Sequence, residues 1–205
     1  MKNYILYKLL QNYVHRGYKQ QKACLRREFA VHTAERPAEL AHRRCSVLEL
    51  ACGDGDLATV FPANVYVGID LMPDRILAAR TRNPGYEFQV CDLTGGDVVG
   101  LMSAADFIFC HAALHHLDDE ACRILLERVQ KHAMKPTTVV AIEPVLPLVW
   151  RNPFGFMLCK LDEGRFVRTA GAWQSLFAGR CQRSEWLSFL PRWPIFGQVY
   201  VARYC

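Results

Sequence analysis

A glycine-rich turn between an apolar run and a helix-like pattern constrains this chain more than any other stretch. Residues 47–50 read VLEL, the small residues ACGDG follow, and the pattern becomes helical at Asp56. This order predicts a strand, a tight turn and a helix over residues 56–61. Because Gly53 and Gly55 lack a Cβ, the turn can adopt positive φ angles and lie against a ligand. The unpaired N–H groups that begin a helix then point at that ligand, so we expect a small-molecule site here.

Strand and helix patterns alternate beyond this turn. Apolar runs predict strands at residues 65–70, 86–91, 105–110 and 138–143. Helical patterns predict helices at 73–82, 118–134 and 170–177, with Asp118 and Thr169 as the caps of the last two. Two further strands, at 185–190 and 198–204, are spaced for an antiparallel pair. We therefore expect an α/β fold with a seven-stranded, mostly parallel sheet, an antiparallel terminal strand and helices on both faces.

Length and charge divide the chain into a leader and a core. A chain of 205 residues is expected to form one domain, with a basic helical leader at 1–44 and a catalytic α/β core at 45–205. The leader is helical in pattern to about Ala41, with an interruption expected at Pro37. Up to Ser46, ten lysines and arginines stand against three glutamates, a charge of +7, and the remainder carries −2. Because the core is slightly acidic, a nucleic-acid partner is not favoured.

Cysteine usage and hydropathy predict the compartment. The nine cysteines are scattered and form no CxxC pair, which is typical of reduced thiols and not of a disulfide framework. No apolar run approaches the length of a transmembrane segment, and the first residues lack the pattern of a signal peptide. We expect a cytoplasmic protein without a transmembrane segment.

Acids and small residues at the predicted strand ends carry a family resemblance over residues 45–145. The stretch from Glu49 to Gly55 is similar to the acidic glycine motif of class I S-adenosylmethionine-dependent methyltransferases. The stretches 69–71 (IDL), 91–93 (CDL) and 107–111 (FIFCH) resemble the motifs of the second, third and fourth strands in that family. Ala51 departs from the pattern, because the family usually has its first glycine there. The resemblance implies a Rossmann-like fold and S-adenosylmethionine as the cofactor.

The resemblance also implies which residues bind the cofactor. Glu49 is expected to face the ammonium group of the methionine moiety, and Asp70 to accept both ribose hydroxyls. Asp92 is expected to bind the adenine amino group, between apolar walls formed by Leu71 and Leu93. The full predicted set contains Glu49, Ala51, Cys52, Gly53, Gly55, Asp70, Leu71, Asp92, Leu93, Cys110 and His111.

The implied reaction moves a methyl group to a small acceptor that is apolar, anionic or carrier-bound, with O-methylation favoured. His111 and His115 are the candidate catalytic residues, because a histidine that titrates near neutral pH can take a proton from an acceptor hydroxyl. Alternatively, these histidines only pack or cap, and positioning alone carries the reaction. No metal site is expected, since no acid or cysteine pair completes a ligand set with the histidines.

Three other functions compete with this interpretation. Residues 53–58 also satisfy G-x-G-x-x-A with Asp70 further along, which is the pattern of a nicotinamide-dependent oxidoreductase. Glu49 before the loop, the acid at Asp92 and the terminal strand pair argue against it. An RNA or protein methyltransferase and a non-catalytic S-adenosylmethionine binder are the remaining alternatives. The sequence leaves the oligomeric state open.

The stretch from Glu143 to Thr169 is rich in prolines and aromatic residues and has no clear period. Long loops in compact domains often serve as functional lids, and this one is expected to start at the active edge of the sheet. We expect Trp150 and Arg168 to contact the acceptor there. The alternative is that this segment covers the sheet as core and that its arginines pair with neighbouring acids.

Overall fold

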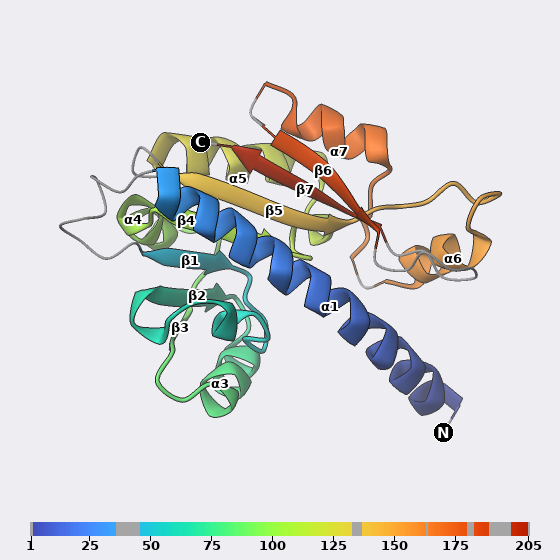
Figure 1. Ribbon diagram of the computed structural model, residues 1–205, viewed down its shortest axis with the longest axis horizontal. Helices are drawn as coiled ribbons and strands as arrows, with labels where there is room; N and C mark the ends of the chain where they lie inside the picture. Colours follow the sequence, from blue (N-terminus) through green and yellow to red (C-terminus); the bar gives the residue numbers. More distant parts are fainter. Residues whose placement is uncertain are drawn as a thin grey trace.

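The computed structural model describes residues 2–35, 46–132, 137–162, 164–179, 183–188 and 198–204. Its centre is a sheet with the strand order β3-β2-β1-β4-β5-β7-β6 (Figure 1). The seven strands are β1 (Val47–Leu50), β2 (Tyr66–Asp70), β3 (Glu87–Val90), β4 (Phe107–His111), β5 (Thr138–Pro144), β6 (Arg183–Ser188) and β7 (Gln198–Tyr204). Strands β1 to β5 pair in parallel, and β7 runs antiparallel to both β5 and β6. The α/β, Rossmann-like, mostly parallel sheet predicted from the sequence is confirmed.

Helices cover both faces of this sheet (Figure 1). One face carries α1 (Lys2–Glu35), the 3-10 turn η1 (Ala58–Val60) and α3 (Pro73–Arg82). The other face carries α4 (Asp97–Ala104), α5 (Asp119–His132) and α7 (Ala170–Phe177). Successive strand residues alternate between the two faces, so Ile108 packs under α4 and α5 while Phe107 and Phe109 pack under α1.

Helix α1 confirms the helical leader as far as Glu35, while Pro37 and Ala41 lie outside the described residues. Its C-terminal half lies across the sheet, and its N-terminal half extends past the edge of the sheet (Figure 1). Leu25 of α1 is fully buried, and the ring of Phe29 meets Phe61 and Phe107 edge to face at 5.2 and 5.5 Å. Aromatic packing therefore fixes the leader to the core.

The helix expected at residues 56–61 is wrong. The chain there makes a turn followed only by η1, because Gly55 has a φ of 72° and the extended Pro62 follows within seven residues. Too few residues remain between these two points for an α-helix with its own hydrogen bonds. A second short turn, η2 (Ala63–Val65), then leads into β2.

Two helices were not predicted from the sequence. Helix α4 follows a glycine pair and begins at Asp97 without a side-chain cap, so the sequence holds no start signal for it. Helix α6 (Pro153–Leu161) lies in the segment that was expected to lack regular structure. It begins with a proline at its first position, and the Asn152 side chain caps it by accepting a hydrogen bond from Gly155 N at 2.7 Å.

The predicted caps of α5 and α7 are both present. Asp118 Oδ1 accepts from Ala121 N at 2.8 Å, and Thr169 Oγ1 accepts from Ala172 N at 3.4 Å. Across the stretches that the structure describes, no helix has both the length and the apolar character needed to cross a bilayer.

Candidate functional site

The sheet has its switch point between β1 and β4. From β1 the chain continues to β2 and β3 on one side, and from β4 it continues to β5 on the other side. Ligands of doubly wound sheets bind in the crevice outside the carboxyl ends of the strands at such a point. Leu50 ends β1 beside Cys110 of β4, and the glycine-rich turn and His111 follow directly. A cavity opens there, lined by Glu49, Ala51, Cys52, Gly53, Asp54, Asp56, Leu57, Arg75, His111 and Ala112.

The turn after β1 depends on left-handed backbone conformations. Ala51, Gly53 and Gly55 have φ angles of 55°, 53° and 72°. Gly55 is further required by space, because a Cβ there would lie 2.8 Å from Asn83 Nδ2 and 2.9 Å from the Phe88 ring. Ala51 adopts the conformation that a glycine would adopt without steric cost. The turn therefore keeps its shape with alanine in place of the family's usual glycine, and the backbone of Ala51 is strained.

Asp70, at the end of β2, holds this turn in place. Its Oδ2 accepts from Gly53 N at 2.9 Å and its Oδ1 accepts from Met72 N at 2.9 Å. A carboxylate offers about four lone-pair sites, so two acceptor positions remain beyond these two bonds. The same side chain thus shapes the glycine turn and keeps capacity for a ligand.

Glu49 and Arg75 bring a buried carboxyl group and a guanidinium to the cavity. Glu49 is 2% exposed, and burial raises the pKa of its carboxyl to about 8, although a hydrogen bond from the Tyr66 hydroxyl lowers it in part. Arg75, from α3, lies against the turn, since a Cβ on Gly53 would be 3.3 Å from Arg75 Nη1. Sequence reasoning missed Arg75, because nothing in the sequence separates it from the other arginines of α3.

His111 is the histidine that faces this cavity. It ends β4, and its Nε2 donates to Gln21 Oε1 of α1 at 2.7 Å. Burial lowers the pKa of His111 to about 4, so its imidazole is neutral at pH 7. Gln21 was missed from the sequence as well, because it lies in the leader, 90 residues from its partner.

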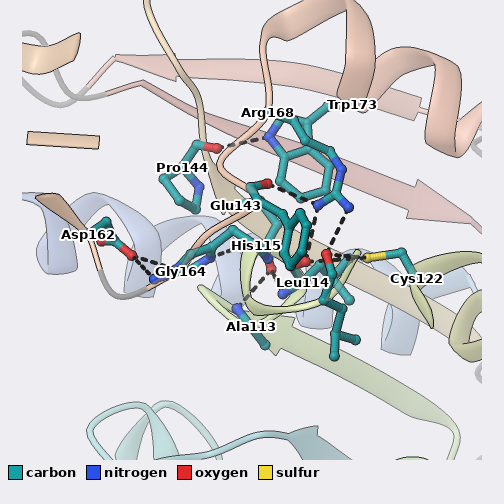
Figure 2. A network of polar contacts seen from close by, with 12 residues as sticks. Ala113, Leu114, His115, Cys122, Glu143, Pro144, Asp162, Gly164, Arg168 and Trp173 are labelled. Atoms are coloured by element: carbon teal, nitrogen blue, oxygen red, sulfur yellow. Dashed lines mark hydrogen bonds and ion pairs between the residues drawn. The ribbon is translucent and has the colours of Figure 1, made fainter. Parts of the chain in front are cut away.

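His115 lies in a buried polar network centred on Glu143 (Figure 2). Glu143 is fully buried and accepts from Ala113 N at 2.9 Å, Leu114 N at 2.8 Å and His115 Nδ1 at 2.9 Å. It thereby fixes the turn η3 (Leu114–His116) to the end of β5. Burial alone would lower the pKa of His115, but hydrogen bonds to Asp162 and Glu143 outweigh it and raise that pKa to about 9. His111 ends β4 and His115 lies in η3, so the two histidines do not share one helical face.

Arg168 anchors the segment after α6 to η3 (Figure 2). It is 7% exposed, donates to Asp119 Oδ1 at 2.8 Å and donates to the carbonyl oxygens of Leu114 and Leu117 at 3.1 and 2.8 Å. Its guanidinium also lies 4.8 Å from the ring centroid of Trp173. The alternative expectation, that this arginine pairs with an acid, is thus the one observed. The acid is Asp119, which is a neighbour in space and not in the sequence.

The cavity lining does not include the predicted residues Gly55, Asp70, Leu71, Asp92, Leu93 and Cys110. Asp92 is exposed, and two hydrogen bonds from Thr94 N and Oγ1, both 2.7 Å, lower the pKa of its carboxyl. Leu71 is 59% exposed after β2, whereas Leu93 packs against the core. Cys110 is buried at the end of β4, and burial raises the pKa of its thiol.

Comparison with known proteins agrees with this architecture. Residues 47–136 match the family model described as "Methyltransferase domain". Among the curated proteins, none matches the chain.

Solved structures of methyltransferases share the fold. The DszA carbon methyltransferase superposes with a TM-score of 0.63 at 17% identity, covering 91% of this chain and 54% of its own. Magnesium protoporphyrin IX methyltransferase from Synechocystis PCC 6803 with bound SAH gives 0.59 at 14% identity, with 92% and 84% covered. Human N-acetylserotonin methyltransferase in complex with SAM gives 0.57 at 22% identity, with 77% and 47% covered. The chain thus spans about half the length of two of these three proteins.

The fold is that of the doubly wound α/β class, with a cavity at its switch point. The family match covers residues 47–136, which are similar to a methyltransferase domain.

Proposed function

We propose that this protein transfers a methyl group from S-adenosylmethionine to a small or carrier-bound acceptor, with oxygen as the favoured methyl acceptor. The observation that carries the proposal is the cavity at the switch point, where a glycine turn, the buried acid Glu49 and the guanidinium of Arg75 meet. A methionine moiety has a carboxylate group that suits Arg75 and an ammonium group that suits Glu49 once that carboxyl loses its proton.

In this proposal each strand end binds one part of the cofactor. Glu49 pairs with the ammonium group, Arg75 pairs with the carboxylate, and the turn around Gly53 packs against the methionine chain. Asp70 uses its two remaining acceptor positions for the ribose hydroxyls. Asp92 and the exposed Leu71 bind the adenine from the β3 and β2 ends.

His111 and His115 take different roles. His111 lines the cavity and is unprotonated at pH 7, so it is the proposed proton acceptor when the methyl acceptor is a hydroxyl oxygen. With a pKa of about 4 it is a weaker base than the near-neutral histidine expected from the sequence. His115 binds two acids and acts as a positioning residue for η3. Methyl transfer itself is an in-line displacement at the sulfonium, for which the protein supplies orientation and exclusion of water.

The acceptor is proposed to bind beside α6 and the preceding loop. Leu148, Val149 and Trp150 are 44%, 47% and 75% exposed there, an apolar surface that a packed core would not leave in solvent. These residues follow β5, whose carboxyl end lies at the same edge of the sheet as the cavity. A small apolar or carrier-bound acceptor fits this surface.

The leader and core are proposed to act as one domain in a reducing compartment such as the cytoplasm. Gln21 of the leader contacts His111 of the cavity, which supports a single domain made of leader and core. The reducing compartment is supported by free thiols at Cys52, Cys91, Cys110, Cys122 and Cys159.

Calorimetric binding of S-adenosylhomocysteine tests the cofactor assignment. Arg75→Ala and Asp70→Asn should each weaken binding by roughly 1.5–3 kcal/mol, the range for hydrogen bonds to charged groups. Arg123→Ala is the matched control, because Arg123 pairs with Glu120 at the surface of α5. Binding of a nicotinamide cofactor in place of S-adenosylhomocysteine would overturn the proposal, and binding without turnover of any labelled acceptor would favour a non-catalytic binder.

A further inference from the structure

Two histidines and an acid meet at the rim of the site, in a place where the sequence predicted no metal ligands. His115 and His116 come from η3, and Asp162 follows α6, 46 residues further along the chain. One ligand atom from each of the three lies within 4.8 Å of the other two. The tertiary structure therefore supplies the acid that the sequence pattern lacked.

From this geometry we infer that His115, His116 and Asp162 form a binding site for a divalent first-row transition metal ion such as Zn²⁺. Two imidazoles and one carboxylate are a common ligand set for such ions, and three protein ligands leave a coordination position open. His115 and Asp162 interact directly in the structure.

The spacing of His115 and Asp162 suits a shared ion. His115 Nε2 lies 3.3 Å from Asp162 Oδ1, which is long for a hydrogen bond between charged groups. With metal–ligand distances near 2.1 Å, two neighbouring ligands of a tetrahedral ion lie about 3.4 Å apart. An ion can therefore enter between these two atoms with little movement, displacing the proton on Nε2 to solvent.

Hydrogen bonds to other residues fix the orientation of both His115 and Asp162. Glu143 Oε2 accepts from His115 Nδ1 at 2.9 Å, so the imidazole presents Nε2 outward, as in carboxylate–histidine–metal sites (Figure 2). Asp162 Oδ1 accepts from Gly164 N at 2.7 Å. Gly164 is also required by space, because a Cβ there would lie 1.8 Å from His115 Cδ2.

His116 completes the set from the solvent side. Its ring centroid is 4.3 Å from that of His115, and the side chain is exposed, so it can rotate toward the ion. The cluster lies next to the cofactor cavity, because Ala112 lines that cavity and η3 begins two residues later. An ion here has its open position available to an oxygen of the acceptor, and this role, unlike the binding of the ion, rests on the proposed function.

Titration with Co²⁺ after chelator treatment tests the inference on the full chain. One Co²⁺ should bind per chain with visible d–d bands and without a thiolate charge-transfer band, since the ligands are nitrogen and oxygen. His116→Ala and Asp162→Asn should each weaken Co²⁺ binding at least tenfold, while His132→Ala, a histidine at the end of α5, should not change it. Both test residues have exposed side chains, so thermal melting should confirm that the variants fold.

Absence of Co²⁺ binding, or binding that both variants retain at full strength, would overturn the inference. Thiolate bands would also overturn it, because they would place the ion on cysteines. If S-adenosylhomocysteine fails to bind while Co²⁺ binding depends on His116 and Asp162, the ion site stands and the proposed function falls.

Discussion

The hydroxyl of Tyr66 donates a hydrogen bond to the carboxyl of Glu49, the acid directly before the glycine turn. Tyr66 begins β2 and is 1% exposed, while Glu49 lies on β1 and is 2% exposed. Both side chains are almost fully buried, and Glu49 is also part of the cavity lining. This pairing makes the charge of Glu49 depend on what the cavity holds.

The first prediction is that cofactor binding releases a proton from Glu49. With its pKa raised to about 8 by burial, Glu49 is largely protonated at pH 7 in the empty cavity. An ammonium group beside it favours the ionised form, so binding lowers this pKa and releases up to one proton. Calorimetry of S-adenosylhomocysteine binding at pH 7 in buffers of different ionisation enthalpy measures the number of protons released per molecule bound. Glu49→Gln should abolish the release, and an unchanged release in that variant would contradict the assignment.

The same carboxyl should make stability depend on pH. Its folded pKa of about 8 exceeds the ordinary value of 4.5, so the folded state binds more protons than the unfolded state between these values. The free energy of unfolding of the empty protein, relative to Glu49→Gln, should therefore fall as pH rises from about 5 to 8. Urea unfolding at several pH values measures this difference, and a difference that rises with pH would refute the burial argument.

The second site prediction concerns His111. Its neutral imidazole lines the cavity, so His111→Ala should lower turnover far more than affinity for S-adenosylhomocysteine if the acceptor is a hydroxyl. Because burial lowers the pKa of His111 to about 4, the rate should show no inflection near pH 6.5 from this residue. His132→Ala serves as the control. Full turnover in His111→Ala would leave positioning alone to carry the reaction.

The variants Arg168→Ala and Trp150→Ala should have different effects: the first should lower stability, and the second should change the acceptor KM. Arg168→Ala leaves buried carbonyl oxygens of η3 and its flank without donors, so it should lower the free energy of unfolding by about 3 kcal/mol or more. Trp150 is 75% exposed, so Trp150→Ala should change stability by less than about 0.5 kcal/mol. Urea unfolding and the acceptor KM are the two measurements. A KM that stays constant in Trp150→Ala would place the acceptor elsewhere.

Ala51→Gly should stabilise the glycine turn. An alanine at a φ of 55° carries left-handed strain of about 1–2 kcal/mol, and glycine costs about 0.5–1 kcal/mol in chain entropy. The substitution should therefore raise the free energy of unfolding by up to about 1 kcal/mol. Ala51→Val should lower it, since a β-branched side chain suits this conformation less. Chemical denaturation of both variants measures these changes, and a destabilising Ala51→Gly would mean that the Ala51 methyl group contributes packing that outweighs the strain.

Local patterns in the sequence were sufficient for the positions of the strands along the chain and for the turn after β1. Alternating apolar runs are set by neighbouring residues, so β1 to β5, the position of α3 and the caps Asp118 and Thr169 could be predicted. Helix α4 could not, because its start lacks a local signal. Helix α6 does have a start signal, Asn152 followed by Pro153, but the prolines before it led to the prediction of a loop.

The sequence by itself determined the fold class and placed Glu49, Asp70 and His111 at the carboxyl edge of the sheet, because parallel strands bring their ends together. Only the tertiary structure decided what those side chains contact. Arg75, Gln21 and Asp162 reach the site from elements distant in the chain, and no spacing in the sequence encodes such contacts. The roles of Arg168 and His115 likewise follow from burial and from partners dozens of residues away, which set hydrogen bonds and pKa values through space.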